Sequence, residues 1–156
     1  MTPPSVVLGG GFLVGLWCDI VVLADTSLYG INATALGITP VMGSSVILEE
    51  ALGAPLAREL LFAGRLVTGL EIRNGRGPLA YTILPHDEVR DRAFSIAQEI
   101  ADNPQKPVSL FKRAISAKRR EILEQALTVE KSMCEHLFGD GNALELIAEL
   151  YPVVAA

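Results

Sequence analysis

The sequence predicts an α/β fold followed by a helical C-terminal segment, and three observations carry this prediction. Three glycines at residues 9–11 precede a short apolar helix and a β-branched strand, which is a typical α/β opening. From residue 86 onward, apolar residues recur at helical spacings instead. The 156 residues, of which 50% are hydrophobic and 20% charged, suffice for one packed core and exclude a disordered chain.

Residues 1–85 are expected to form the α/β part. Its predicted elements are, in order, a helix over 12–17, a buried strand over 19–24, a loop over 34–45, helices over 45–52 and 55–62, a turn-rich stretch over 66–77 and a strand over 79–84. The helix over 55–62 has the clearest ends, because Pro55 fits a first helical turn and Gly64 follows the last one.

Residues 86–156 are expected to be helical. Asp87 fits as the N-cap of a first helix to residue 102, and Asn103-Pro104 ends it. A longer helix then runs to Gly139, and a short one over 143–150 stops at Pro152. The longer helix has one predicted apolar face, made of Phe111, Ile115, Ile122, Ala126, Val129, Met133 and Leu137. Three aromatic side chains are expected in the core, those of Trp17, Phe62 and Phe111.

Charge and cysteine content argue against several classes of protein. The net charge of -5 disfavours a nucleic-acid-binding protein, which needs clustered Lys and Arg. Cys18 and Cys134 lie far apart without a ligand pattern, so we predict no disulfide framework or metal site, and a reducing cytoplasm fits. We also expect no cofactor. Residues 5–24 are long enough to cross a membrane, but their glycines and Asp19 argue against a span, and no basic leader marks a secretory signal.

Gly9, Gly10 and Gly11 leave two interpretations open. Glycines before a helix can present backbone N–H groups to an anion, aided by the partial positive charge of the helix N-terminus. They can equally serve close packing of a helix on a strand. The sequence lacks the G-x-G-x-x-G pattern and the Lys-Ser/Thr ending of a nucleotide loop, so no dinucleotide or nucleoside triphosphate site is predicted.

Several ordered motifs together resemble the enoyl-CoA hydratase/isomerase (crotonase) superfamily. They are Gly9–Ile20 with its GGG and Cys-Asp, Tyr29, Leu36–Gly43, Leu52-Gly53 and Ala63-Gly-Arg65. The resemblance covers nearly the whole chain but corresponds to the C-terminal part of the usual family domain. It implies part of a spiral of β-β-α units, with C-terminal helices that help to build a trimer.

Two departures from the family pattern bear on the reaction. At the positions of the two glutamates that hydratases place near the thioester, this sequence has Leu13 and Ala33, so it lacks the acid/base pair for hydration. Asn32 with Leu36–Gly43 instead resembles the hydratase-like decarboxylases of polyketide β-branching cassettes, as Glu130–Phe138 does weakly. That resemblance implies decarboxylation of a 3-methylglutaconyl-type thioester on an acyl carrier protein or coenzyme A. The alternatives are an enoyl-thioester isomerase and a truncated, non-catalytic subunit.

The resemblance also implies roles for individual residues. The Gly10 N–H would be one of two donors to the thioester oxygen, with Gly9, Gly11, Asn32 and Gly43 binding substrate around it. The second donor and a carboxylate-binding lysine belong to the family's N-terminal part, which this sequence lacks.

Two further residues keep a functional and a structural interpretation. His136 would be the proton donor, although it lies one turn before the position of the subgroup's histidine, and a histidine there also suits a helix C-terminus. The position of His86 between Pro85 and Asp87 indicates a turn residue. Lys112 belongs to a basic cluster over 112–120, which is either a solvated helix face or a contact for the phosphates of coenzyme A or phosphopantetheine.

Overall fold

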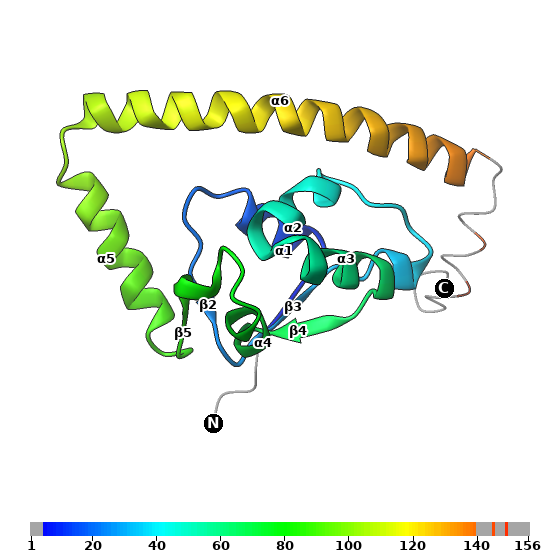
Figure 1. Cartoon of the computed structure of the whole chain (residues 1–156), viewed down its shortest axis with the longest axis horizontal. Coiled ribbons are helices and arrows are strands. Elements are labelled where there is room, and N and C mark those ends of the chain that lie inside the picture. Colours follow the sequence, from blue (N-terminus) through cyan, green and yellow to red (C-terminus); the bar gives the residue numbers. More distant parts are fainter. Residues whose placement is uncertain (1–4, 140–144, 146–148, 150–156) are drawn as a thin grey trace.

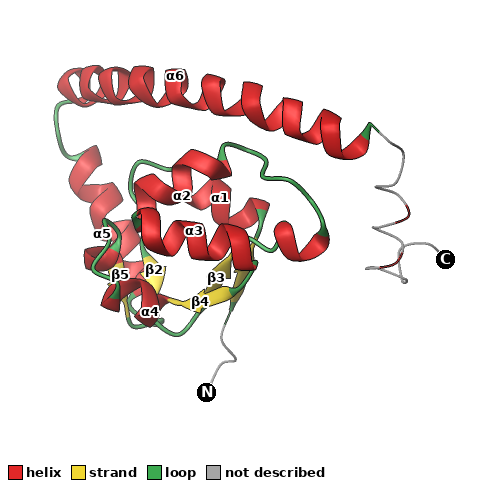
Figure 2. Cartoon of the chain, turned by 45° about the vertical axis from the view of Figure 1, so that its right-hand side comes forward, coloured by secondary structure: helices red, strands yellow, loops and turns green. Residues whose placement is uncertain are grey.

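Two small β-sheets carry the α/β part of the chain. The computed structural model describes residues 5–139 together with residues 145 and 149. In the first sheet, β3 (Leu28–Gly30) lies between β1 (Val6–Leu8), which is parallel to it, and β4 (Leu66–Thr68), which is antiparallel. In the second sheet, β2 (Leu23–Ala24) pairs in parallel with β5 (Ile83–Leu84). Three helices, α1 (Gly10–Leu16), α2 (Ser44–Leu52) and α3 (Ala54–Ala63), lie on one side of the strands (Figure 2).

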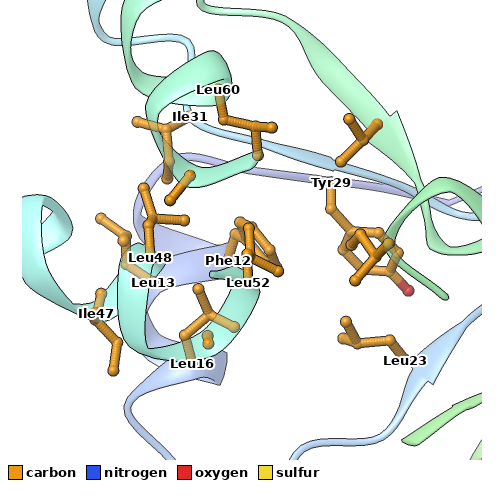
Figure 3. Close-up of a cluster of buried hydrophobic side chains, with 14 of the residues drawn as sticks. Phe12, Leu13, Leu16, Leu23, Tyr29, Ile31, Ile47, Leu48, Leu52 and Leu60 are labelled. Atoms are coloured by element: carbon orange, nitrogen blue, oxygen red, sulfur yellow. The ribbon is translucent and has the colours of Figure 1, made fainter. Parts of the chain in front are cut away.

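The core forms where these three helices meet the strands. Helices α1, α2 and α3 each contribute apolar side chains spaced three to four residues apart, as an amphipathic helix requires. The fully buried members include Phe12, Leu13, Ile47, Leu48, Leu60 and, from β4, Val67. Phe12 contacts the ring of Tyr29 from β3, at 5.4 Å between ring centroids (Figure 3). The core therefore fixes α1 against β3, directly behind the three glycines.

The helices over 45–52 and 55–62 were predicted within one residue of their observed ends. Glycines separate them, since Gly53 stands between α2 and α3 with a φ of 80°, and Gly64 ends α3 in the left-handed region. Pro55 lies in the first turn of α3, as expected.

Two predicted strands are mostly wrong. Only Leu23–Ala24 of residues 19–24 is a strand, because a strand needs a partner and β5 reaches only these two residues. Asp19 instead pairs with Lys112, and Ile20 is exposed. Within 79–84, residues 80–82 form the short 3-10 helix η2, and only the last two residues are β5.

The stretch over 66–77, expected to be turns, contains β4 and the helix α4 (Gly69–Asn74). A reciprocal capping box starts this helix. The Thr68 hydroxyl accepts from the Glu71 N–H at 3.1 Å, and the Glu71 carboxylate accepts from the Thr68 N–H at 2.7 Å. The Thr-x-x-Glu spacing is visible in the sequence and predicts a helix start.

Two helices follow the α/β part. Helix α5 (Val89–Ala101) leads away from β5, and α6 (Gln105–Phe138), 34 residues long, crosses over α2 on the outside of the molecule (Figure 1). The N-cap of α5 is Glu88, without a side-chain hydrogen bond, rather than the expected Asp87. The predicted end of the long helix before Gly139 is confirmed. The helix predicted over 143–150 lies outside the described residues, apart from 145 and 149.

Most of the predicted apolar face of α6 does not pack on the body. Ala126 is its only buried member in the part of the chain described here, and Phe111 is 72% exposed. The side facing the body carries Arg119, Leu123, Ala126, Glu130 and Cys134 instead, so polar contacts from this stripe hold the helix. The apolar stripe lies beside the docking stripe and remains open. Phe62 is also exposed, at 77%, so the expected burial of Phe62 and Phe111 is wrong.

Gly69→Ala should be strongly destabilising. A Cβ at Gly69 would lie 2.0 Å from the Ala24 carbonyl oxygen and 2.9 Å from the Asp25 Cα, both backbone atoms that cannot move without disturbing β2. Overpacking of this kind typically costs 1–3 kcal/mol, so we expect a loss of at least ~2 kcal/mol in the free energy of unfolding, measured by urea titration. Gly15→Ala is the matched control. Among the described residues, no atom outside its own helix and chain neighbours lies within 4 Å of its Cβ, and alanine near the end of α1 should be neutral or stabilising.

Candidate functional site

The three glycines form the turn from β1 into α1. Gly9 adopts a φ of 54°, which favours glycine, and its N–H donates to the Gly30 carbonyl at 3.0 Å. Its carbonyl accepts the Leu13 N–H at 3.1 Å and so starts the helix. Gly10 and Gly11 are exposed residues of the first turn, where backbone N–H groups have no partner inside the helix. The Gly10 N–H is therefore available to a ligand.

Two side chains from the segment between β3 and α2 lie beside these glycines. The Met42 Sδ is 3.5 Å from the position that a Cβ would take on Gly10, and the Asn32 Oδ1 is 3.8 Å from the corresponding position on Gly9. The structure therefore brings the predicted oxyanion donor Gly10 together with Gly9 and Asn32 of the predicted substrate-binding set. It adds Met42, for which the Leu36–Gly43 motif predicted no separate role.

Met42 and Gly43 form an unusual turn next to Gly10. Both residues have left-handed backbone angles, with φ of 60° and 72°. The Trp17 indole N–H donates to the Met42 carbonyl at 2.8 Å. A Cβ on Gly43 would lie 2.7 Å from both the Trp17 ring and the Leu123 side chain, so only glycine fits there. Gly43 thus shapes this turn through its backbone.

A buried carboxylate from α6 holds the same turn. Glu130 is 3% exposed, and its Oε2 accepts the Gly43 N–H at 2.8 Å. Its Oε1 accepts the Ser45 hydroxyl at 3.0 Å and the Ser45 N–H at 3.3 Å. Since α2 has no capping side chain of its own, Glu130 supplies acceptors to its first free N–H groups. This role of Glu130 was not predictable from the sequence, because Glu130 binds residues more than eighty positions away.

The basic cluster is partly used to dock α6. Lys112 forms an ion pair with Asp19, and the Arg119 guanidinium donates to the Glu50 carboxylate at 2.8 and 3.0 Å and to two backbone carbonyls. A solvated face is therefore an incomplete description of this cluster. Lys112 remains 55% exposed and thus accessible to an anion.

His136 and Cys134 lie in the last turns of α6. His136 is exposed, and its side chain makes no hydrogen bond to the residues that the structure describes. The Cys134 thiol contacts the Thr39 hydroxyl at 2.9 Å, which ties the end of α6 to the loop before Met42. The structure thus brings the end of α6 to the loop that contains Thr39, without placing His136 against Gly10.

Two cavities flank this region. One, of about 350 Å³, lies behind α1 and is lined by Phe12, residues 21–24, Tyr29, His86 from the turn before α5, and Arg90 from the start of α5. Burial raises the pKa of Tyr29, whose hydroxyl donates to the Ala24 carbonyl and accepts its N–H, so Tyr29 is a neutral structural phenol. The other, of about 690 Å³, is a groove between α2 and α6 lined by Val46, Glu50, Ile115, Lys118, Arg119 and Ile122.

Within residues 5–139, 145 and 149, no group of three or more His, Cys, Asp or Glu residues could hold a metal ion. No helix of this described part is long and apolar enough to cross a membrane.

The family model described as enoyl-CoA hydratase/isomerase matches residues 5–145 of the chain. The chain belongs to this family. The predicted family membership is therefore confirmed, and with it the predicted fold, a partial crotonase-like α/β spiral with a helical C-terminal segment.

Individual members of the enoyl-CoA hydratase/isomerase family refine this assignment. The bacillaene synthase decarboxylase PksI of Bacillus subtilis is 34% identical over 92% of this chain and 57% of its own length. A solved structure of a dehydratase/decarboxylase enzyme couple involved in polyketide β-branching is 34% identical, with a TM-score of 0.78 over 84% of this chain and 57% of that one. These matches confirm the predicted resemblance to the β-branching decarboxylases.

Hydratases of the family are similar as well. A probable mitochondrial enoyl-CoA hydratase of Dictyostelium discoideum is 29% identical over 88% of this chain and 49% of its own length. The chain thus spans about half the length of the curated relatives it matches.

Proposed function

We propose that the protein containing this chain decarboxylates a 3-methylglutaconyl-type thioester, carried on an acyl carrier protein or coenzyme A, through an oxyanion-stabilised enolate. One observation carries the proposal. The two positions at which hydratases of the family place glutamates are Leu13 and Ala33. Leu13 is 1% exposed inside the core, and Ala33 packs against that core. Neither position offers a group that could activate water.

Decarboxylation does not need such a base. When the bond between the substrate carbon and its carboxylate breaks, CO2 leaves and the bonding electrons pass into the conjugated thioester as an enolate. The exposed Gly10 N–H is suited to donate to the oxygen that gains this charge. A proton then returns to carbon, and we assign its delivery to His136.

The second half of the chain fits two supporting roles. We propose that residues 86–156 serve oligomerisation, as a trimer, and thioester binding. The open apolar stripe of α6 suits the first role. Two exposed lysines of α6 suit the second by offering ammonium groups to a phosphate of the carrier arm: Lys118, which lines the groove between α2 and α6, and Lys112, which lies earlier on the same helix.

The test measures decarboxylation and hydration in one preparation of the protein that contains this chain. With a carboxyl-labelled 3-methylglutaconyl thioester on a carrier protein, we expect labelled CO2 to be released. With crotonyl-CoA, we expect no loss of the enoyl-thioester absorbance beyond the enzyme-free rate. Hydration of crotonyl-CoA would overturn the proposal, and an absence of both reactions would favour a non-catalytic subunit.

His136→Ala should slow the proposed reaction. Loss of a general acid typically costs 10²- to 10⁴-fold in rate, so we expect kcat for CO2 release and product formation to fall by at least ~10²-fold. His86→Ala is the matched control and should stay near the wild-type rate, because His86 lines the cavity behind α1. Unchanged kinetics in His136→Ala would assign the proton to another group.

A further inference from the structure

Glu130 is a buried charged group that the proposed reaction does not use. We propose that it is a positioning residue, which holds Met42 against Gly10 from α6 and thereby sets which acyl groups the site accepts. The inference rests on the proposed acyl-thioester function and extends it to substrate selection.

The contacts of Glu130 converge on one turn. Its two carboxylate oxygens accept three hydrogen bonds, one from Gly43 and two from Ser45, at 2.8 to 3.3 Å. A carboxylate with 3% exposure is costly to bury unless its oxygens are satisfied, so these bonds define a single position for the turn. An exposed acceptor at the start of α2 would cap the helix equally well, so capping alone does not require a buried charge from another helix.

The turn held in this way is a disfavoured one. Met42 has a side chain, yet its φ of 60° lies in the left-handed region that such residues rarely adopt. Trp17 holds it through the Met42 carbonyl at 2.8 Å, and Glu130 holds the next residue through the Gly43 N–H. Strained backbone of this kind persists only where the surroundings fix it, and it clusters at ligand sites.

Fixing Met42 shapes the space beside Gly10. The Met42 Sδ lies 3.5 Å from the position of a Gly10 Cβ, so the thioether borders the place where a thioester oxygen would bind. A methionine side chain is flexible and fills such space loosely unless its backbone is anchored. Because the turn is anchored, a substituent of the substrate near the thioester carbonyl meets the Met42 side chain in one fixed position. The site can therefore distinguish a substrate with a methyl branch from one with hydrogen at that place.

The first arm of the test measures selectivity. The ratio of kcat/KM for 3-methylglutaconyl and unbranched glutaconyl thioesters on the same carrier should fall about 10-fold in Glu130→Ala, the discrimination that one methyl group typically provides. Met42→Ala should change the ratio equally, and the double variant no further, because the two residues act as one unit. Glu130→Gln, which keeps one acceptor oxygen, should restore part of the ratio. Glu124→Ala, an exposed acid on the same helix, should leave it unchanged.

The second arm needs no turnover. The chain has three methionines, Met1, Met42 and Met133, so methyl-labelled protein gives three NMR signals, and Met42→Leu assigns one. Glu130→Ala should shift or broaden the Met42 signal, whereas Glu124→Ala should not. Where Glu130→Ala does not fold, Glu130→Gln replaces it in both arms.

An unmoved Met42 signal, or equal losses for both thioesters, would overturn the positioning role. If the wild-type protein that contains this chain releases no CO2, the proposed function is overturned instead, and the Met42 signal then decides the inference alone.

Discussion

Gly10→Pro should lower CO2 release by about 10²- to 10³-fold, the usual cost of removing one oxyanion donor. Proline has no backbone N–H, so the substitution deletes the donor directly. The fold should tolerate it, because Gly10 is the first residue of α1, where proline fits the helix and the missing N–H has no helical partner. Single-turnover kinetics, with circular dichroism melting of the same sample, would measure both effects.

Gly10→Ala is the matched control for this prediction. It retains the N–H, and its Cβ would meet only the Met42 Sδ, at an ordinary contact distance of 3.5 Å. Most of the turnover should therefore remain. A folded Gly10→Pro protein that turns over as fast as Gly10→Ala would remove Gly10 from the reaction.

The second large effect concerns self-association. We expect the chain to be larger than a monomer at micromolar concentration, because α6 leaves Phe111, Ile115, Val129 and Met133 exposed along one stripe. Phe111→Asp/Val129→Asp should convert it to a monomer, since a buried unpaired carboxylate in each contact is costly. Multi-angle light scattering would show the change in mass.

Ser132→Asp is the control for that pair. Ser132 is an exposed polar residue of the same helix, so an added charge there should leave the mass unchanged. A wild-type chain that is already monomeric would show that the apolar stripe needs no second copy.

The predictable parts of the structure were those that depend on local sequence. Proline in the first turn and a glycine at the end delimit α3, and the Thr-x-x-Glu spacing at residue 68 could have revealed α4. The ordered glycine motifs led to the family and to the cluster of Gly9, Gly10 and Asn32.

The parts that could not be predicted depend on distant partners. Of the strand predicted over 19–24, only two residues are a strand, because β5 is its only partner among the described residues and pairs with just those two. The apolar periodicity of α6 correctly identified a stripe of apolar side chains. The helix contacts the body through the neighbouring side instead, because Arg119 and Glu130 form hydrogen bonds with the body from that side. The hydrogen bond from the Gly43 N–H to the Glu130 carboxylate joins residues 87 positions apart, and no local sequence pattern predicts such a contact.

The central claim is tested most directly by an intact-mass measurement. A carrier protein loaded with 3-methylglutaconyl thioester is incubated with the protein that contains this chain, and the mass of the carrier is then determined. The proposed decarboxylation predicts that the loaded carrier loses the mass of CO2, with the acyl group still attached. A carrier that gains the mass of one water molecule would show hydration, and a carrier of unchanged mass would show no reaction, and either result would contradict the claim.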